Sequence, residues 1–110
     1  MGDVGSYMVF ENEKIMIWEL VLEPGQQTAC HTHRHDYVFY VIEGSTLEVF
    51  DKNEDFLFAF ASNTGDAFAF KCQEGQLVSS DDKGLQVTAT HSARNAGRIR
   101  YREILVETKC

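Results

Sequence analysis

The sequence has few of the features that mark a secreted or membrane protein. Its three cysteines, Cys30, Cys72 and Cys110, are an odd number at irregular spacing and make no disulfide framework. No run approaches the ~20 apolar residues of a membrane span. The segment Met1–Tyr7 lacks the basic residues and apolar run of a secretory signal. We therefore expect a cytoplasmic protein with free thiols and no association with a membrane.

Basic residues are also scarce. Lysine and arginine number 10 against 17 aspartates and glutamates, so the formal net charge is −7. An acidic surface repels phosphate backbones, which argues against a nucleic-acid partner. With 110 residues, of which 44% are hydrophobic, the chain can bury one core. We expect residues 1–110 to form a single domain.

Helical periodicity is absent, and Pro24 is the only proline. Short runs rich in aromatic and β-branched residues alternate with turn-rich stretches, including one at Ala93–Gly97. The predicted strands are Tyr7–Glu11, Ile15–Leu22, Thr28–His33, Tyr37–Ile42, Thr46–Phe50, Phe56–Ala61, Ala67–Phe70, Leu77–Ser79, Leu85–His91 and Ile99–Val106. Short strands at near-regular spacing predict an all-β sandwich or small barrel.

Two of these strands carry unusual patterns. Ile15–Leu22 is apolar at nearly every position, which indicates burial on both faces, against a second sheet, a second subunit or neighbours within the monomer. In the last strand Arg98, Arg100 and Arg102 alternate with other residues, as in a solvated face or an anion site. The alternation blurs past Glu103, which predicts a bulge there.

All four histidines lie in two places. His31, His33 and His35 are spaced by two residues, and His91 lies in a late strand. Because side chains alternate along an extended chain, the first three share one face with Tyr37 and the apolar residues that follow it. That face places imidazoles at the mouth of an apolar interior.

Imidazole is a common ligand of divalent transition metals. Two histidines at i and i+2 on a strand can share one ion, and His91 is the candidate for a third ligand from another strand. The alternative is a set of histidines satisfied by hydrogen bonds or solvent. Three histidines on one strand face, together with a fourth histidine in a distant strand, favour a metal site.

These residues resemble the first sequence motif of the cupin superfamily. In that motif a glycine is followed by five residues, His-x-His, three or four residues, a glutamate, six residues and a glycine. Here Gly25 is followed at these spacings by His31, His33, Tyr37 and Gly44. The one departure is Tyr37, which stands where the family usually has a metal-binding glutamate.

The second cupin motif ends in His, three residues and Asn, which His91 and Asn95 match. The resemblance implies an all-β double-stranded β-helix, a jelly-roll barrel, that pairs into a homodimer. It also implies that His31, His33 and His91 bind one divalent transition metal: iron, nickel, zinc or manganese.

The remaining polar residues of the first motif are candidates for catalysis. Tyr37 and His35 share the predicted inner face, so either can contact metal or substrate. The resemblance implies a metalloenzyme acting on a small, anionic organic molecule, as a dioxygenase or as a lyase or isomerase. The alternative is a non-catalytic module that binds a metal or a small ligand.

Overall fold

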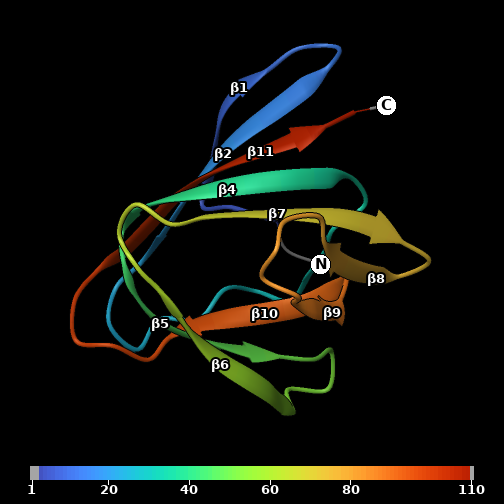
Figure 1. Cartoon of the computed structure of the whole chain (residues 1–110). Helices are drawn as coiled ribbons and strands as arrows, with labels where there is room; N and C mark the ends of the chain where they lie inside the picture. The colour runs from blue at the N-terminus through green and yellow to red at the C-terminus, as the bar shows by residue number, and fades with distance from the viewer. Residues whose placement is uncertain (1–2, 110) are drawn as a thin grey trace.

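The computed structural model describes residues 3–109, which form eleven β-strands and no helix. Two antiparallel sheets face each other, with β4, β7 and β11 in one layer and β5, β6 and β10 in the other (Figure 1). The strands are β1 (Tyr7–Glu11), β2 (Ile15–Leu22), β3 (His31–Thr32), β4 (Asp36–Glu43), β5 (Ser45–Phe50), β6 (Phe56–Ser62), β7 (Ala67–Gln73), β8 (Gln76–Ser79), β9 (Gln86–Thr88), β10 (Thr90–Asn95) and β11 (Tyr101–Thr108).

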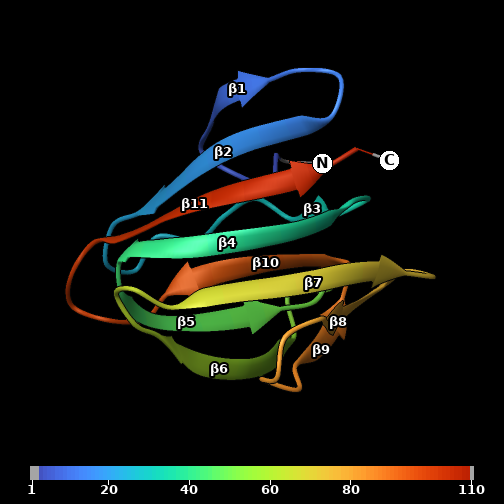
Figure 2. The same cartoon turned by 45° about the horizontal axis from the view of Figure 1, so that its top comes forward.

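The larger sheet has the order β1-β2-β11-β4-β7-β8-β9, and the smaller has the order β3-β10-β5-β6. The chain crosses repeatedly between the two layers, as Figure 2 shows for β4 and β5 and for β10 and β11. The all-β prediction is confirmed. None of the described residues forms a helix long and apolar enough to cross a bilayer.

Most predicted strands appear within one to three residues of their predicted bounds. The prediction for Thr28–His33 is wrong in extent, because only His31 and Thr32 pair, with β10. The predicted strand Leu85–His91 is also wrong, because it divides at Ala89 into β9 of the larger sheet and β10 of the smaller. The predicted turn at Ala93–Gly97 starts too early, because β10 continues to Asn95.

The break at Ala89 has a clear physical role. Its amide N donates to the carbonyl of Gly75 at 2.8 Å, and its carbonyl accepts from the amide of His33 at 2.9 Å. Ala89 is therefore bonded to the β7–β8 turn on one side and to the histidine segment on the other. This link holds His33 beside β10 although His33 lies outside any strand.

The core lies between the two sheets and consists of inward-facing residues from both. Alternation along β4 and β11 buries every second side chain, as expected for strands with one face inward. The buried apolar set is Leu20, Leu22, Tyr37, Phe39, Val41, Leu47, Phe68, Phe70, Leu77, Ala89, Tyr101 and Leu105.

The structure explains why the first motif has glycine at positions 25 and 44. At Gly44, a Cβ would lie 2.4 Å from the Thr64 amide N and 2.5 Å from the Ser62 carbonyl O, so no side chain fits between β4 and β5. Gly25 has a φ of +84°, which glycine adopts without steric cost. Both positions therefore fix the turns that bring the motif's strands together.

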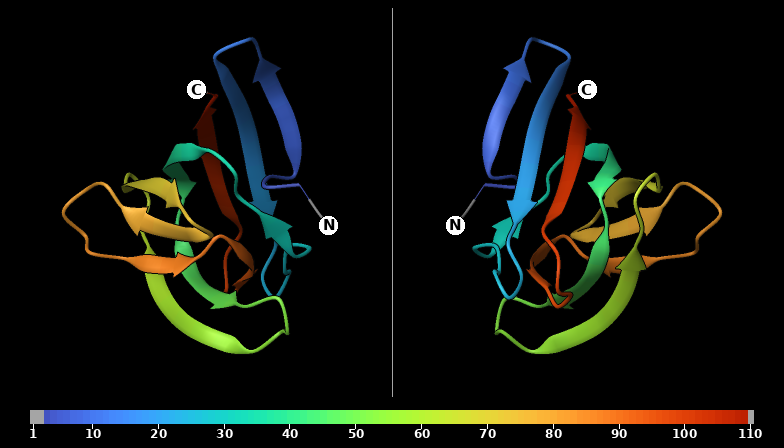
Figure 3. Two further views of the ribbon diagram at one scale, coloured as in Figure 1. Left: turned by 90° about the vertical axis from the view of Figure 1, so that its right-hand side faces the viewer. Right: turned by 90° about the vertical axis from the view of Figure 1, so that its left-hand side faces the viewer.

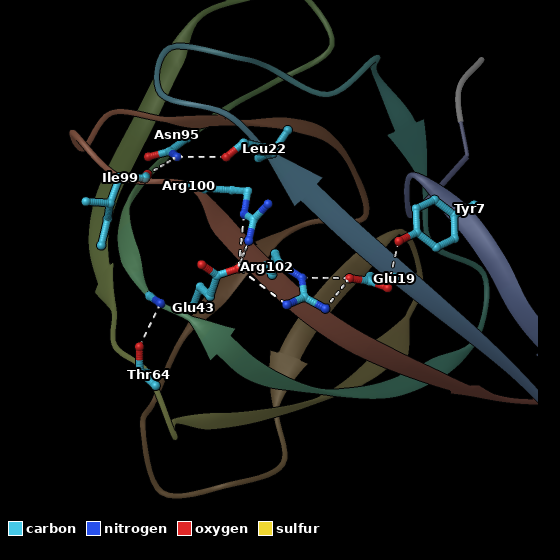
Figure 4. A network of polar contacts seen from close by, with 10 residues as sticks. Tyr7, Glu19, Leu22, Glu43, Thr64, Asn95, Ile99, Arg100 and Arg102 are labelled. Carbon is cyan, nitrogen blue, oxygen red and sulfur yellow. Dashed lines mark hydrogen bonds and ion pairs between the residues drawn. The ribbon is translucent and has the colours of Figure 1, made fainter.

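The arginines of the last strand pair with carboxylates (Figure 4). Arg100 and Arg102 both contact Glu43, at 2.8 and 3.4 Å, and Arg102 also contacts Glu19 at 2.8 Å. Arg98 is exposed. The pattern fits the solvated-face interpretation, because Arg100 and Arg102 already have anionic partners. The predicted bulge is confirmed by a register shift between Arg102 and Glu103.

The β1–β2 hairpin extends beyond the barrel at one corner (Figure 3). β2 lies between β1 and β11, so Ile15–Leu22 is a central strand of the larger sheet. Only Leu20 and Leu22 in it are buried, and its other residues are partly exposed. β1 is an edge strand, and Tyr7, Met8, Val9 and Phe10 on it are all exposed. These large apolar side chains are uncovered by the rest of the described chain.

Candidate metal centre

The structure brings together His31, His33 and His91. His31 and His91 are directly opposite each other in the β3–β10 pair, and His33 follows β3. The ring centres lie 4.9 Å apart for His31–His33 and for His31–His91, and 5.0 Å apart for His33–His91. Each ring offers one nitrogen, and all three nitrogens lie within 4.8 Å of one another.

Backbone carbonyls fix two of the rings. The Nδ1 of His31 lies 3.0 Å from the Ala29 carbonyl O, and the Nδ1 of His91 lies 2.8 Å from the Thr88 carbonyl O. A carbonyl only accepts, so in each pair Nδ1 carries the hydrogen and donates it. Nε2 then carries a free lone pair and can bind a metal. A hydrogen bond from the other ring nitrogen to a carbonyl commonly fixes the tautomer and orientation of metal-binding histidines in this way.

The third ring has an unsatisfied nitrogen. His33 is buried, and its Nδ1 has no hydrogen-bond partner within the described residues. A buried polar atom without a partner costs about 1–3 kcal/mol, and such atoms are rare in native proteins. A metal ion bound through this nitrogen would remove the cost, so the residues present fit a metal ion.

Burial keeps the three imidazoles neutral. It lowers the pKa of His33 to about 2, with the charges of His91 and His31 adding to the effect. It lowers the pKa of His91 to about 4, and the pKa of His31 also falls. Neutral rings have the lone pairs that a metal needs.

Tyr37 lies beside the centre, as predicted. Its ring stacks on His33 with a centroid distance of 4.4 Å and an interplanar angle of 15°. Burial raises the pKa of its phenol well above 10, and the carboxylates of Glu103 and Glu107 raise it further. The hydroxyl therefore stays protonated at neutral pH, and Tyr37 is one of the residues that line the cavity beside the histidines.

His35 lies elsewhere. It lines a separate open groove with Trp18 and Glu107, whereas the cavity beside the three histidines does not include it. The reason is that β3 ends at Thr32, so the alternation expected from His31 through His35 does not hold. The structure thus gives no support to the predicted place of His35 on the same face as the metal ligands.

A cavity of about 80 Å³ adjoins the three histidines. One water needs about 10–15 Å³ of such space, so the cavity takes a ligand of roughly five to eight non-hydrogen atoms. Most of its wall is apolar. Besides the histidines, its lining is Val4, Leu20, Thr28, Tyr37, Phe39, Leu47, Val49, Phe58, Phe60, Phe70, Leu85, Val87, Ala93, Glu103 and Leu105.

Glu103 is the charged residue of this wall that the sequence reasoning missed. It is only 4% exposed, and the Tyr101 hydroxyl donates to its Oε1 at 2.7 Å. Burial raises the pKa of its carboxyl to about 7, although that hydrogen bond favours the charged form. The signal was present in the sequence, because Tyr101, Glu103 and Leu105 share one strand face by alternation.

Asn95, the last residue of the second motif, has a structural role. It is fully buried, and its amide nitrogen donates to the carbonyls of Leu22 and Ile99 at 2.9 and 2.8 Å (Figure 4). Its oxygen accepts from the Ser45 hydroxyl at 2.7 Å and the Gly97 amide at 3.0 Å. Asn95 thereby ties the β10–β11 turn to two other parts of the barrel.

No protein-family model matches the chain, and no curated protein sequence matches it with significance. Solved structures do match. A cupin domain from Bordetella pertussis Tohama I has a TM-score of 0.70 at 16% identity, over 94% of this chain and 91% of that one. An uncharacterized conserved protein with a double-stranded β-helix domain, from Klebsiella pneumoniae, has a TM-score of 0.58 at 19% identity, over 92% and 72%.

A third structure has a described activity. It is a sugar phosphate isomerase of the cupin superfamily from Silicibacter pomeroyi, with a TM-score of 0.56 at 18% identity. The match covers 89% of this chain and 52% of that one, so this chain spans about half of its length. Two facing antiparallel sheets, this strand order and these matches together identify the fold of the chain as the cupin double-stranded β-helix.

Proposed function

We propose that the chain is a mononuclear metalloenzyme that acts on a small organic anion in the cavity beside the three histidines. The observation that carries this proposal is the buried cluster of His31, His33 and His91, in which His33 Nδ1 has no hydrogen-bond partner among residues 3–109. A bound divalent transition metal supplies Lewis-acid or oxygen-activating chemistry. Iron, nickel, zinc or manganese suits an all-imidazole set, whereas magnesium and calcium prefer oxygen ligands.

The charge of the site supports an anionic ligand. All three ligating groups are neutral, so a divalent ion here keeps its full charge within an apolar wall. A carboxylate or similar group beside the histidines lowers the cost of burying that charge. The apolar wall and the small volume favour a compact aliphatic molecule over a sugar or a nucleotide.

The cavity residues favour proton-transfer chemistry of the lyase or isomerase type. Tyr37 stacks on His33 and keeps its hydroxyl protonated, which makes it a hydrogen-bond donor. Glu103 has a pKa of about 7, so near neutral pH it can give or accept a proton.

An oxygenase is the alternative that the three-histidine set supports, because a site without a carboxylate resembles that of cupin thiol dioxygenases. The test is to load the protein with each candidate metal and screen small carboxylic acids for binding by thermal shift. Bound compounds are then assayed for turnover with and without oxygen. Turnover in both conditions supports the lyase or isomerase, and turnover only with oxygen supports the oxygenase. Binding without turnover of any compound indicates a non-catalytic module.

We also propose that two copies of the chain pair through the outer face of the larger sheet. An apolar row crosses four adjacent strands of this sheet, because Phe10 pairs with Ile17, Ile17 with Val106, and Val106 with Val38. Phe10 is 49% exposed and Val38 is 40% exposed. A two-fold axis would place this row against its own copy and cover it.

A further inference from the structure

The cavity beside the metal centre has polar groups at two places. The histidines, with Tyr37 stacked on His33, form one, and the carboxyl of Glu103 on β11 forms the other; Thr28 is the remaining polar residue of the wall. In the β4–β11 pair, Tyr37 faces Glu107 and Val41 faces Glu103. Since a strand advances about 3.3–3.4 Å per residue, the backbone of Glu103 lies roughly 13 Å further into the barrel than that of Tyr37, which stacks on His33.

One oxygen of this carboxyl is held by the protein. The Tyr101 hydroxyl donates to Oε1 at 2.7 Å and itself lies 3.1 Å from the Ser62 hydroxyl O, so this oxygen has a fixed position. The other oxygen, Oε2, is not among the fully buried atoms without a partner, a set in which His33 Nδ1 stands alone among the described residues. Since Glu103 is only 4% exposed and lines the cavity, Oε2 is the oxygen that a ligand there can reach. A carboxylate oxygen is an acceptor, so in this mostly apolar wall it offers a hydrogen-bond site to a ligand that carries a donor.

We propose that Glu103 recognises the end of the ligand remote from the three histidines, and that it selects molecules with a hydroxyl or amino donor at that end. This inference rests on the proposed function, because the opposite end of the ligand is placed by the metal. The ligand class is then a short aliphatic carboxylate with a terminal donor. The apolar side chains between the two polar ends, among them Phe39 and Leu105, contact its methylene groups.

The test compares ligands of equal size that differ only in the terminal donor. The pairs are 3-hydroxypropanoate with butanoate, 4-hydroxybutanoate with pentanoate, and 5-hydroxypentanoate with hexanoate. Each pair replaces a methyl group by a hydroxyl. The protein is loaded with Co²⁺, whose visible absorption reports carboxylate binding, and each dissociation constant is confirmed by calorimetry.

In the parent protein at least one hydroxy acid should bind tenfold or more tightly than its methyl counterpart, because a hydrogen bond to a buried carboxyl is lost with the hydroxyl. In Glu103→Leu this preference should disappear or reverse. Glu103→Gln retains an acceptor and should show a reduced preference, and it serves as the second variant if Glu103→Leu fails to fold. The control is Glu107→Gln, a buried carboxyl on the same strand that does not line the cavity; it should keep the parent's preference.

The outcomes separate this inference from the proposed function. If Co²⁺ binds and the acids change its spectrum, but no pair shows a preference in the parent, the role of Glu103 is overturned and the metal site stands. An unchanged preference in both Glu103 variants also overturns it. If the parent takes up no Co²⁺, both the metal site and the inference are overturned.

Discussion

Burial of Glu103 makes a specific prediction about stability and pH. In the folded protein the pKa of its carboxyl is about 7, against an ordinary value of 4.5. Above pH 4.5 the unfolded chain therefore releases this proton more readily than the folded chain, and the folded state loses stability as the pH rises. One pKa unit corresponds to about 1.4 kcal/mol, so 2.5 units cost the folded state about 3 kcal/mol at pH 8.

Glu103→Gln removes this cost, because the amide has no charge and still accepts a hydrogen bond from Tyr101. The difference in free energy of unfolding, variant minus parent, should therefore be about 3 kcal/mol larger at pH 8 than at pH 4.5. Urea titrations followed by the fluorescence of Trp18, the single tryptophan, measure this difference. A chelator keeps both proteins free of metal, and the contribution of the histidines cancels between them. A difference that stays constant from pH 4.5 to pH 8 would refute the assignment of a buried, uncompensated carboxyl at this position.

Three further outcomes are expected. Asn95→Ala removes four hydrogen bonds from a fully buried site and should lower the free energy of unfolding by about 4 kcal/mol, measured by urea titration; a loss under 1 kcal/mol would contradict its proposed tethering role. Sedimentation at micromolar concentration should show a dimer, and Phe10→Glu with Val38→Glu should give a monomer of unchanged circular dichroism; a monomeric parent would contradict the pairing. Zinc or nickel at 100 times its dissociation constant should stabilise the protein by about 2.7 kcal/mol, whereas magnesium and calcium should not raise the melting temperature.

The sequence was sufficient to predict the fold and the three histidines of the candidate metal centre. The spacing of Gly25, His31 and His33 reflects local geometry, because a positive φ at the glycine and a short extended segment bring both imidazoles to one place. His91 was predictable because it is the one histidine outside the first cluster and because, with Asn95, it matches the second cupin motif. The structure then places it opposite His31 in an antiparallel pair. Periodicity and motif spacing are local properties, and they carry this information directly.

The remaining features depend on where strands end. The alternation that assigned His35 to the site assumed a continuous strand, whereas pairing stops at Thr32. The division at Ala89 arises because the chain passes from one sheet to the other, which no local pattern marks. Strand alternation predicts that the Glu103 side chain points inward, but it does not predict the surroundings of that side chain. The cavity that Glu103 lines is formed by residues from nearly every strand.

The central claim is that three histidines hold one metal ion, and the most direct test is metal content. Four proteins are loaded with Zn²⁺ or Fe²⁺ and desalted: the parent, His33→Ala, His91→Ala and His35→Ala. Their metal content is then measured by inductively coupled plasma mass spectrometry. The account predicts one ion per chain in the parent and in His35→Ala, the matched histidine outside the cluster, and almost none in the other two variants. Equal metal content in His33→Ala and the parent would contradict it.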